Sequence, residues 1–333
     1  MDVLVTGGCG YIGSVLVPSL AARDDVDRVV VLDDLSSGSP RALMGALGNG
    51  NVAFHRGDVR EYGDVENALR GVDTVVHLAA ITGASSTHDR REETFAVNLD
   101  GTENVLKAAG KLGVGDVVLA SSCNVYGRAT STDLTETVDP DPINPYAETK
   151  LRAEQLLADY CDAHDMRGTA LRMSTNYGFA PGVRFNLVVN YFVFRALTGR
   201  TLTVYGDGSN WRPFVHVRDA AAAYEHAATN ADDWDHHVYN VGSGDANYRI
   251  AEIAEIVLEE VGPVDVTYLE DEHPGPSYHV NFDRLAATGY ETEWTLRAGI
   301  RDVADRFVEG DAGESVNRHA NTDADETSTT DHD

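Results

Sequence analysis

The chain has 333 residues, of which 42% are hydrophobic and 8% are aromatic, so it can bury a large core. Its net charge of −28 would repel phosphate backbones and anionic lipid surfaces, which argues against nucleic acid as a partner. No apolar run of about 18 residues occurs and the first residues do not resemble a signal peptide, so we predict a cytoplasmic protein without a membrane partner.

Acidic side chains outnumber basic ones by 54 to 26. Such a composition resembles that of proteins from salt-loving organisms, in which high ionic strength screens self-repulsion, and it predicts a halophilic protein. The three cysteines show neither CxxC nor Cys/His ligand spacing, so no disulfide framework and no metal site is predicted for Cys9, Cys123 and Cys161.

Short β-branched runs alternate with helical patterns through the first half of the chain. Buried parallel strands are expected at 2–6, 28–32, 52–55, 74–78 and 116–120. Helices long enough to cross a sheet face and begin the next parallel strand are expected at 11–22, 61–70 and 94–112. This alternation predicts an α/β fold with a doubly wound parallel sheet, the Rossmann architecture.

The second half of the chain interrupts this sheet. A helix is expected at about 146–163, and two further strands of the same sheet are expected at 168–173 and 236–242. The remaining segments predict a second, smaller α+β lobe, with a ligand between the two parts. The last residues are polar and acidic and cannot offset their own ordering entropy. We therefore predict a dinucleotide-binding domain over 1–173 plus 214–242. A substrate-binding lobe is predicted over 174–213 plus 243–310, and a disordered acidic tail over 311–333.

The segment TGGCGYIGS follows the first expected strand and opens a helix. In this position Gly7 suits a tight turn, Gly10 lets the backbone approach a pyrophosphate, and Gly13 allows close helix packing. A glycine-rich turn that binds nothing is the alternative for the motif alone. Its place after a strand and before a helix favours a dinucleotide site.

An acidic residue stands where the second expected strand ends, in VLDDL. Asp33 is expected to accept hydrogen bonds from the adenosine ribose, although Asp34 could be the closer carboxylate. A carboxylate there would repel a 2′-phosphate, so NAD is favoured over NADP. Asp58, in the loop GDVR, could contact the adenine edge through its side chain or the amide of Val59, or could simply form a turn.

Tyr146 and Lys150 are four residues apart at the start of a helix, so both side chains rise from one face. A phenol with a pKa near 10 is a poor base at neutral pH, and a nearby ammonium group would favour the phenolate. A solvated helix face is the alternative for this pair alone. The fifth expected strand changes that balance, because it leaves Ser121 and Ser122 at the carboxyl edge of the sheet, where such folds hold ligands.

Taken in order, these motifs resemble the extended short-chain dehydrogenase/reductase family, in its nucleotide-sugar epimerase and dehydratase branch. The resemblance covers about residues 1–305 and rests on TGGCGYIGS, VLDDLSSG, GDVR, HLAA, ASSCNVYG, PYAETK, RMSTNYG and RPFVHVRD. In that family the residue four before the tyrosine of VYG carries the catalytic hydroxyl, which corresponds to Ser122.

The resemblance implies a division of labour at the site. Tyr146 would take the proton of a sugar hydroxyl while hydride passes from the same carbon to NAD, and Ser122 would hydrogen-bond that oxygen. Lys150 would hold the nicotinamide ribose and lower the pKa of the tyrosine. Further NAD contacts are implied for Tyr11, Ile12, Leu78, Ala79 and Asn98.

On the substrate side, Arg212 matches an arginine that clasps the diphosphate in similar enzymes, with a surface salt bridge as the alternative. The chain departs from the pattern of similar enzymes at two positions on the substrate side. Relatives commonly have asparagine three residues after the strand arginine, where this chain has Thr175, with Asn176 adjacent. Many also have arginine where this chain has His273. The sequence therefore leaves the identity of the nucleotide and of the sugar open.

The residues after Ser122 bear on the reaction. Similar 4,6-dehydratases have an Asp and Glu pair there, which eliminates water, whereas this chain has Cys123 and Asn124. The expected activity is a nucleotide-sugar 4-epimerase of the UDP-glucose 4-epimerase type. A reductase, a decarboxylase, a dehydratase and a catalytically silent NAD-binding sensor are the alternatives. Helices at 94–112 and 146–163 could form the four-helix contact of a homodimer, as in similar enzymes.

Overall fold

The computed structural model describes residues 1–83, 86–128, 133–270 and 275–309. At its centre is a seven-stranded sheet in which every neighbouring pair is parallel. In spatial order the strands are β3 (Val52–Arg56), β2 (Arg28–Asp33), β1 (Asp2–Thr6), β4 (Thr74–His77), β5 (Asp116–Ser122), β6 (Arg167–Met173) and β10 (Val238–Val241). The order reverses between β1 and β4, which is the point at which doubly wound sheets hold dinucleotides. The predicted α/β fold is confirmed.

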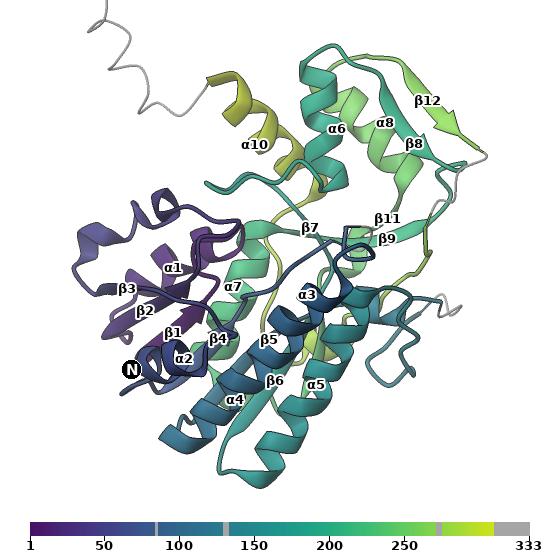
Figure 1. Cartoon of the computed structure of the whole chain (residues 1–333). Helices are drawn as coiled ribbons and strands as arrows, with labels where there is room; N and C mark the ends of the chain where they lie inside the picture. The colour runs from purple at the N-terminus through teal and green to yellow at the C-terminus, as the bar shows by residue number, and fades with distance from the viewer. Residues whose placement is uncertain (84–85, 129–132, 271–274, 310–333) are drawn as a thin grey trace, which may run out of the picture.

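Helices cover both faces of this sheet (Figure 1). One face packs on α1 (Gly13–Ala21) and α7 (Val217–Thr229), and the other on α2 (Tyr62–Ala68), α4 (Gly101–Leu112) and α5 (Pro145–Ala163). Successive residues of β1 alternate between the two cores, with Val3 and Val5 on the α1 side and Leu4 on the α4 side. Burial on both faces explains why the strands are continuous apolar runs.

The second, smaller lobe has a core of its own. It contains a three-stranded sheet, β11 (Asn247–Arg249), β9 (Trp211–His216) and β7 (Thr175–Tyr177), and a two-stranded sheet, β12 (Val266–Leu269) and β8 (Leu202–Tyr205). Helices α6 (Val188–Leu197), α8 (Ile250–Val261) and α10 (Leu296–Glu309) contact one another around that core. In Figure 1 α6, α8, β8 and β12 lie together beyond one end of the large sheet.

The helix expected at 94–112 differs in detail. It begins as α3 (Arg91–Phe95), passes through a π-helical turn (Ala96–Asp100) and continues as α4. The extra residue of a π turn is frequent at functional sites. Within this turn the buried side chain of Asn98 accepts a hydrogen bond from the amide of Ile81 at 2.7 Å and donates to the hydroxyl of Thr149 at 3.2 Å.

Short elements complete the fold. They are the 3₁₀ helices Pro40–Leu43, Leu47–Asn49, Cys123–Tyr126, Ala231–Asp233 and Gly244–Ala246, and the helix α9 (Asp283–Ala286). No helix in the described part of the chain is long and apolar enough to span a bilayer. The predicted tail at 311–333 and His273 lie outside the described residues. The boundaries given above for the two lobes stay a prediction.

Candidate active site

The glycine turn joins β1 to α1 at the switch point of the sheet. Gly7 has φ +69°, and a Cβ added there would lie 2.8 Å from the amide nitrogen of Ala79 in the loop after β4. The turn therefore requires glycine both for its backbone conformation and for its contact with Leu78 and Ala79. At Gly13 an added Cβ would lie 2.6 Å from the backbone of Gly8, so this glycine keeps the turn compact.

Asp33 ties the end of β2 to this turn. Its carboxylate accepts hydrogen bonds from the amides of Cys9 at 2.9 Å and Leu35 at 2.8 Å. Burial raises the pKa of Asp33, and these two amide hydrogen bonds oppose the rise. Asp34, in contrast, is exposed and its carboxylate accepts from the amide of Ser36. Of the two carboxylates, Asp33 is the one that lies against the glycine turn.

The loop GDVR after β3 is less clearly a ligand site. The carboxylate of Asp58 forms an ion pair with Arg60, which holds the pKa of Asp58 below its usual value. Val59 is buried and its carbonyl accepts a hydrogen bond from the side chain of Asn104 at 3.0 Å. The turn-forming alternative for Asp58 thus has direct structural support, while its proposed contact with adenine stays a prediction.

Three other residues expected to contact NAD make contacts that link neighbouring segments of the site. The hydroxyl of Tyr11 donates to the carbonyl of Gly178 at 2.6 Å, which links the glycine turn to the smaller lobe. Ile12 packs beside Tyr11 in the same apolar cluster. Asn98 joins the loop after β4 to α5, as described above, so its amide is engaged with Ile81 and Thr149.

The start of α5 places Tyr146 and Lys150. Asn144 caps this helix by accepting a hydrogen bond from the amide of Ala147 at 2.9 Å, and Pro145 occupies the first helical position. One turn further on, the Nζ atom of Lys150 lies 5.9 Å from the ring centre of Tyr146. Lys150 is buried, whereas Tyr146 keeps part of its surface accessible to a ligand.

Ser122, at the end of β5, completes the group. Burial raises the pKa of Tyr146, and a hydrogen bond from Ser122 and the positive charge of Arg184 act against that rise. Burial lowers the pKa of Lys150 to about 8, and Glu154 one turn along opposes this effect. The structure therefore brings Ser122, Tyr146 and Lys150 together, but burial outweighs the neighbouring charges at the phenol. This differs from the sequence-based expectation that the charge of Lys150 would favour the phenolate form of Tyr146.

His77, at the end of β4, is buried and neutral. Its two ring nitrogens hydrogen-bond the hydroxyls of Thr6 at 2.6 Å and Thr102 at 2.9 Å. Complete burial, with a smaller effect of the charge on Lys150, lowers the pKa of His77 to about 3. This histidine is a strand-end residue that stays neutral near neutral pH and takes up no second proton there.

On the substrate side, Arg212 lies on β9 with its guanidinium carbon 4.8 Å from the ring centre of Tyr278. Its Nη1 atom is buried and has no hydrogen-bond partner among the described residues. A buried guanidinium donor without a partner is costly in free energy, and an anionic ligand would satisfy it. Thr175 and Asn176 are successive residues of β7 and so point to opposite faces of that strand. Only one of them can face such a ligand.

Sequence reasoning missed two residues of the site, Arg184 and Tyr278, and it did not foresee the contacts of Asn124. Arg184, in the segment after β7, lies close enough to Tyr146 and Tyr11 for its charge to lower the pKa of both phenols. Asn124 hydrogen-bonds Ser122, and Tyr278 hydrogen-bonds Asn124. Arg184 and Tyr278 are distant in the chain from Ser122 and lie in none of the motifs quoted above, so no signal in the sequence singled them out. Asn124 lies within ASSCNVYG, but the motif alone does not show its contact with Tyr278.

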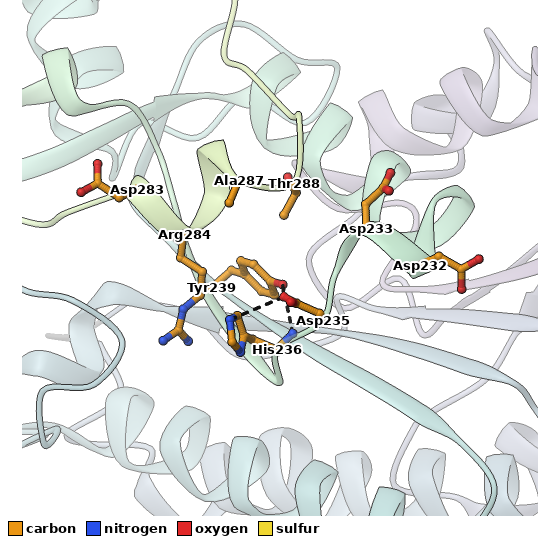
Figure 2. Close-up of a pocket in the computed structure, with 9 residues that line it drawn as sticks. All are labelled: Asp232, Asp233, Asp235, His236, Tyr239, Asp283, Arg284, Ala287 and Thr288. Atoms are coloured by element: carbon orange, nitrogen blue, oxygen red, sulfur yellow. Dashed lines mark hydrogen bonds and ion pairs between the residues drawn. The ribbon is translucent and has the colours of Figure 1, made fainter.

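Figure 2 shows a pocket of about 410 Å³ that lies elsewhere. It is lined by Asp232, Asp233, Asp235, His236, Tyr239, Asp283, Arg284, Ala287 and Thr288. Most of these residues precede or begin β10, so the pocket lies near the amino end of that strand. Ligands of doubly wound sheets bind at the carboxyl ends, and no predicted site residue lines this pocket.

The comparisons with known proteins show the family of this chain. The sequence profile of the NAD-dependent epimerase/dehydratase family matches residues 3–242, and the chain belongs to this family. It is an enzyme family that uses NAD.

Particular relatives have several activities. The chain is 34% identical to the low-salt glycan biosynthesis protein Agl12 of Haloferax volcanii, over 93% of this chain and 100% of that protein. It is also 34% identical to a dTDP-glucose 4,6-dehydratase of Actinoplanes, over 91% of this chain and 96% of that one. Among solved structures, the UDP-glucose 4-epimerase of Thermus thermophilus in complex with NAD superposes with a TM-score of 0.81, at 30% identity, over 93% and 100% of the two chains.

The described residues fit NAD. The turn at Gly7 leaves no room for a side chain beside Ala79, and its amides open the helix α1, where the positive end of the helix attracts a pyrophosphate. The contact of Asp33 with a ribose stays a prediction, and its carboxylate lies against the glycine turn through the amide of Cys9. Bound NAD supplies a hydride acceptor and donor for the substrate carbon.

Proposed function

We propose that this enzyme is an NAD-dependent nucleotide-sugar 4-epimerase that acts on a UDP-sugar such as UDP-glucose. The observation that carries this proposal is the grouping of Ser122, Tyr146 and Lys150 without a carboxylate next to Ser122 in the chain. The partnerless Nη1 atom of Arg212 supports a diphosphate in the substrate. The names of the relatives, which include UDP-glucose 4-epimerases, support the same class of reaction.

In the proposed reaction the chain's own residues handle one proton. The phenol oxygen of Tyr146 removes the proton of the sugar hydroxyl and later returns it. Ser122 hydrogen-bonds the sugar oxygen in both directions. Lys150, whose pKa of about 8 leaves it mostly charged at neutral pH, holds the ribose and adds a positive charge near the phenol. The hydrogen bond from Ser122 and the charge of Arg184 counteract the effect of burial on the pKa of Tyr146.

Elimination of water would need a further acid and base, and the two residues after Ser122 are poor candidates. The thiol of Cys123 is buried and donates a hydrogen bond to the carbonyl of Arg172 at 3.1 Å, and burial raises the pKa of this thiol to about 12. Asn124 is an amide and does not titrate. An epimerase needs no such pair, since hydrogen leaves and returns at one carbon. This contrast favours epimerisation over dehydration.

The test is product analysis in D₂O with NAD and UDP-glucose. An epimerase gives an isomer of unchanged mass without carbon-bound deuterium, because only the oxygen proton exchanges with solvent. A dehydratase gives a product lighter by one water that carries deuterium on carbon. UDP-glucuronate, run in parallel, would lose carbon dioxide in a decarboxylase. A net rise in the absorbance of reduced nicotinamide would indicate net hydride transfer from the sugar to NAD, which is the reaction of a reductase in its oxidative direction.

A catalytically silent sensor would bind both ligands without any product, which would contradict the proposal. Tyr205→Phe is a suitable control, because Tyr205 is an exposed residue of β8 in the smaller lobe. It removes a phenol hydroxyl away from the three grouped residues and should leave the product and its rate unchanged.

We also propose that the chain forms a homodimer and that it works in the cytoplasm. Helices α4 and α5 pack side by side on one face of the large sheet, as the four-helix contact requires. The exposed Leu112 at the end of α4 would then become partly covered. Light scattering of the purified chain should give twice its mass of 36.0 kDa, and a monomer at all concentrations would contradict the dimer.

A further inference from the structure

Asn124 makes two hydrogen bonds to the same atom. Its backbone amide and its side-chain Nδ2 atom both donate to the Oγ atom of Ser122, each at 3.2 Å. A serine hydroxyl has one proton to donate and two lone pairs to accept. With both lone pairs engaged by Asn124, the remaining proton of Ser122 must be donated elsewhere.

The direction left for that proton leads to the reacting group. Ser122 is a hydrogen-bond partner of Tyr146 and lowers the pKa of that phenol. Because the Oγ atom of Ser122 already accepts twice from Asn124, Ser122 is the donor in this pair. A donor in this direction stabilises the phenolate and can equally serve the oxygen of a bound sugar. A serine free to rotate would spend part of its time pointing elsewhere.

A second contact holds the amide of Asn124 in this orientation. The hydroxyl of Tyr278 donates to its Oδ1 atom at 3.1 Å, which leaves the NH₂ group toward Ser122. Tyr278 is buried and lies beneath the guanidinium of Arg212. A continuous chain of contacts therefore runs from Arg212 through Tyr278 and Asn124 to Ser122 and Tyr146.

We propose that Asn124 is a positioning residue that fixes the proton of Ser122 on the Tyr146 side, with Tyr278 holding the amide in place. The proposal deepens the function proposed above and rests on it for its kinetic readout. A residue at this position that only fills space would not orient the hydroxyl of Ser122.

The decisive variant is Asn124→Asp, which has nearly the same shape but can only accept hydrogen bonds when ionised. The carboxylate would accept the proton of Ser122 and turn it away from Tyr146. We expect kcat to fall about tenfold to a hundredfold, with the KM for UDP-glucose near its wild-type value. The acidic limb of the pH profile should move to higher pH, because the phenolate of Tyr146 loses its donor.

A spectroscopic titration measures the same effect without turnover. Tyrosinate absorbance against pH, with the curve of Tyr146→Phe subtracted, reports the pKa of Tyr146 alone. In Asn124→Asp this pKa should rise. If wild type converts no nucleotide sugar but the rise is found, the proposed function fails while the positioning role stands.

The matched control is Asn49→Asp, which adds the same charge at an exposed residue in the 3₁₀ helix Leu47–Asn49. It should leave kcat and the titration unchanged. Should Asn124→Asp not fold, Tyr278→Phe removes only the donor that holds the amide, and it should shift the pKa of Tyr146 in the same direction by less. An unchanged pKa and an unchanged pH profile in a folded variant would overturn the proposal.

Discussion

Replacement of Lys150 by methionine is expected to stabilise the protein while it removes activity. Lys150 is buried, and its pKa falls from 10.5 to about 8 because burial disfavours the charged form. At 1.36 kcal/mol for each pKa unit, this difference of about 2.5 corresponds to about 3 kcal/mol of lost stability at neutral pH. Methionine has a similar length and no charge, so Lys150→Met should recover up to that amount.

The pH dependence gives the sign of the effect. Below about pH 8 the ammonium is present in both the folded and the unfolded chain, and the full penalty applies. Between pH 8 and 10.5 the unfolded chain binds the proton and the folded one releases it, so the stability of the wild type rises with pH. The advantage of Lys150→Met should therefore be largest near neutral pH and shrink over this range.

Urea unfolding without NAD, at about pH 7 and about pH 10, measures this difference directly. Lys107→Met is the matched control, since Lys107 is an exposed residue of α4 and its replacement should change stability by no more than about 0.5 kcal/mol. Turnover of Lys150→Met should fall by about a hundredfold or more. A variant that is less stable than the wild type at neutral pH would refute the reasoning from burial.

Three further predictions concern the cofactor turn, the core beside the site and the surface. Gly7→Ala should destabilise the fold by about 1–2 kcal/mol, because Gly7 has φ +69°. The variant should also lose the rise in melting temperature that NAD causes, and an undiminished rise would contradict the close approach of Gly7 to Ala79. Arg172→Met should cost about 3–5 kcal/mol in urea unfolding, since it strands the buried carboxylate of Glu154, and a cost below about 1 kcal/mol would count against a true ion pair. With a net charge of −28, the chain should gain stability as KCl is raised, and full stability at low salt would argue against a halophilic protein.

Most of the large sheet could be predicted because its strands are buried on both faces. Runs such as that in β2 are continuous and β-branched, and the glycine turn follows β1 directly. Pairing order follows from the alternation of strands and helices, which leaves few topologies for a parallel sheet. The sequence also placed Tyr146, Lys150 and Ser122 at one edge, because the spacing within a helix and the end of a strand are local features.

The remaining parts of the site depend on contacts between distant segments. The π-helical turn that holds Asn98 adds one residue to a helix, and the periodicity of side chains is too coarse to show it. The choice between Asp33 and Asp34 depended on which carboxylate meets the glycine turn, which is a tertiary contact. Tyr278 reaches Asn124 from 154 residues away. Such pairings carry no signature in a single sequence.

The central claim is that the phenol of Tyr146 moves the proton of a nucleotide sugar. The most direct test is Tyr146→Phe assayed with NAD and UDP-glucose, with binding of both ligands followed by thermal shift. We predict unchanged shifts and a loss of turnover of about a hundredfold to ten-thousandfold, because only the hydroxyl is removed. Turnover by Tyr146→Phe at the wild-type rate would contradict the account.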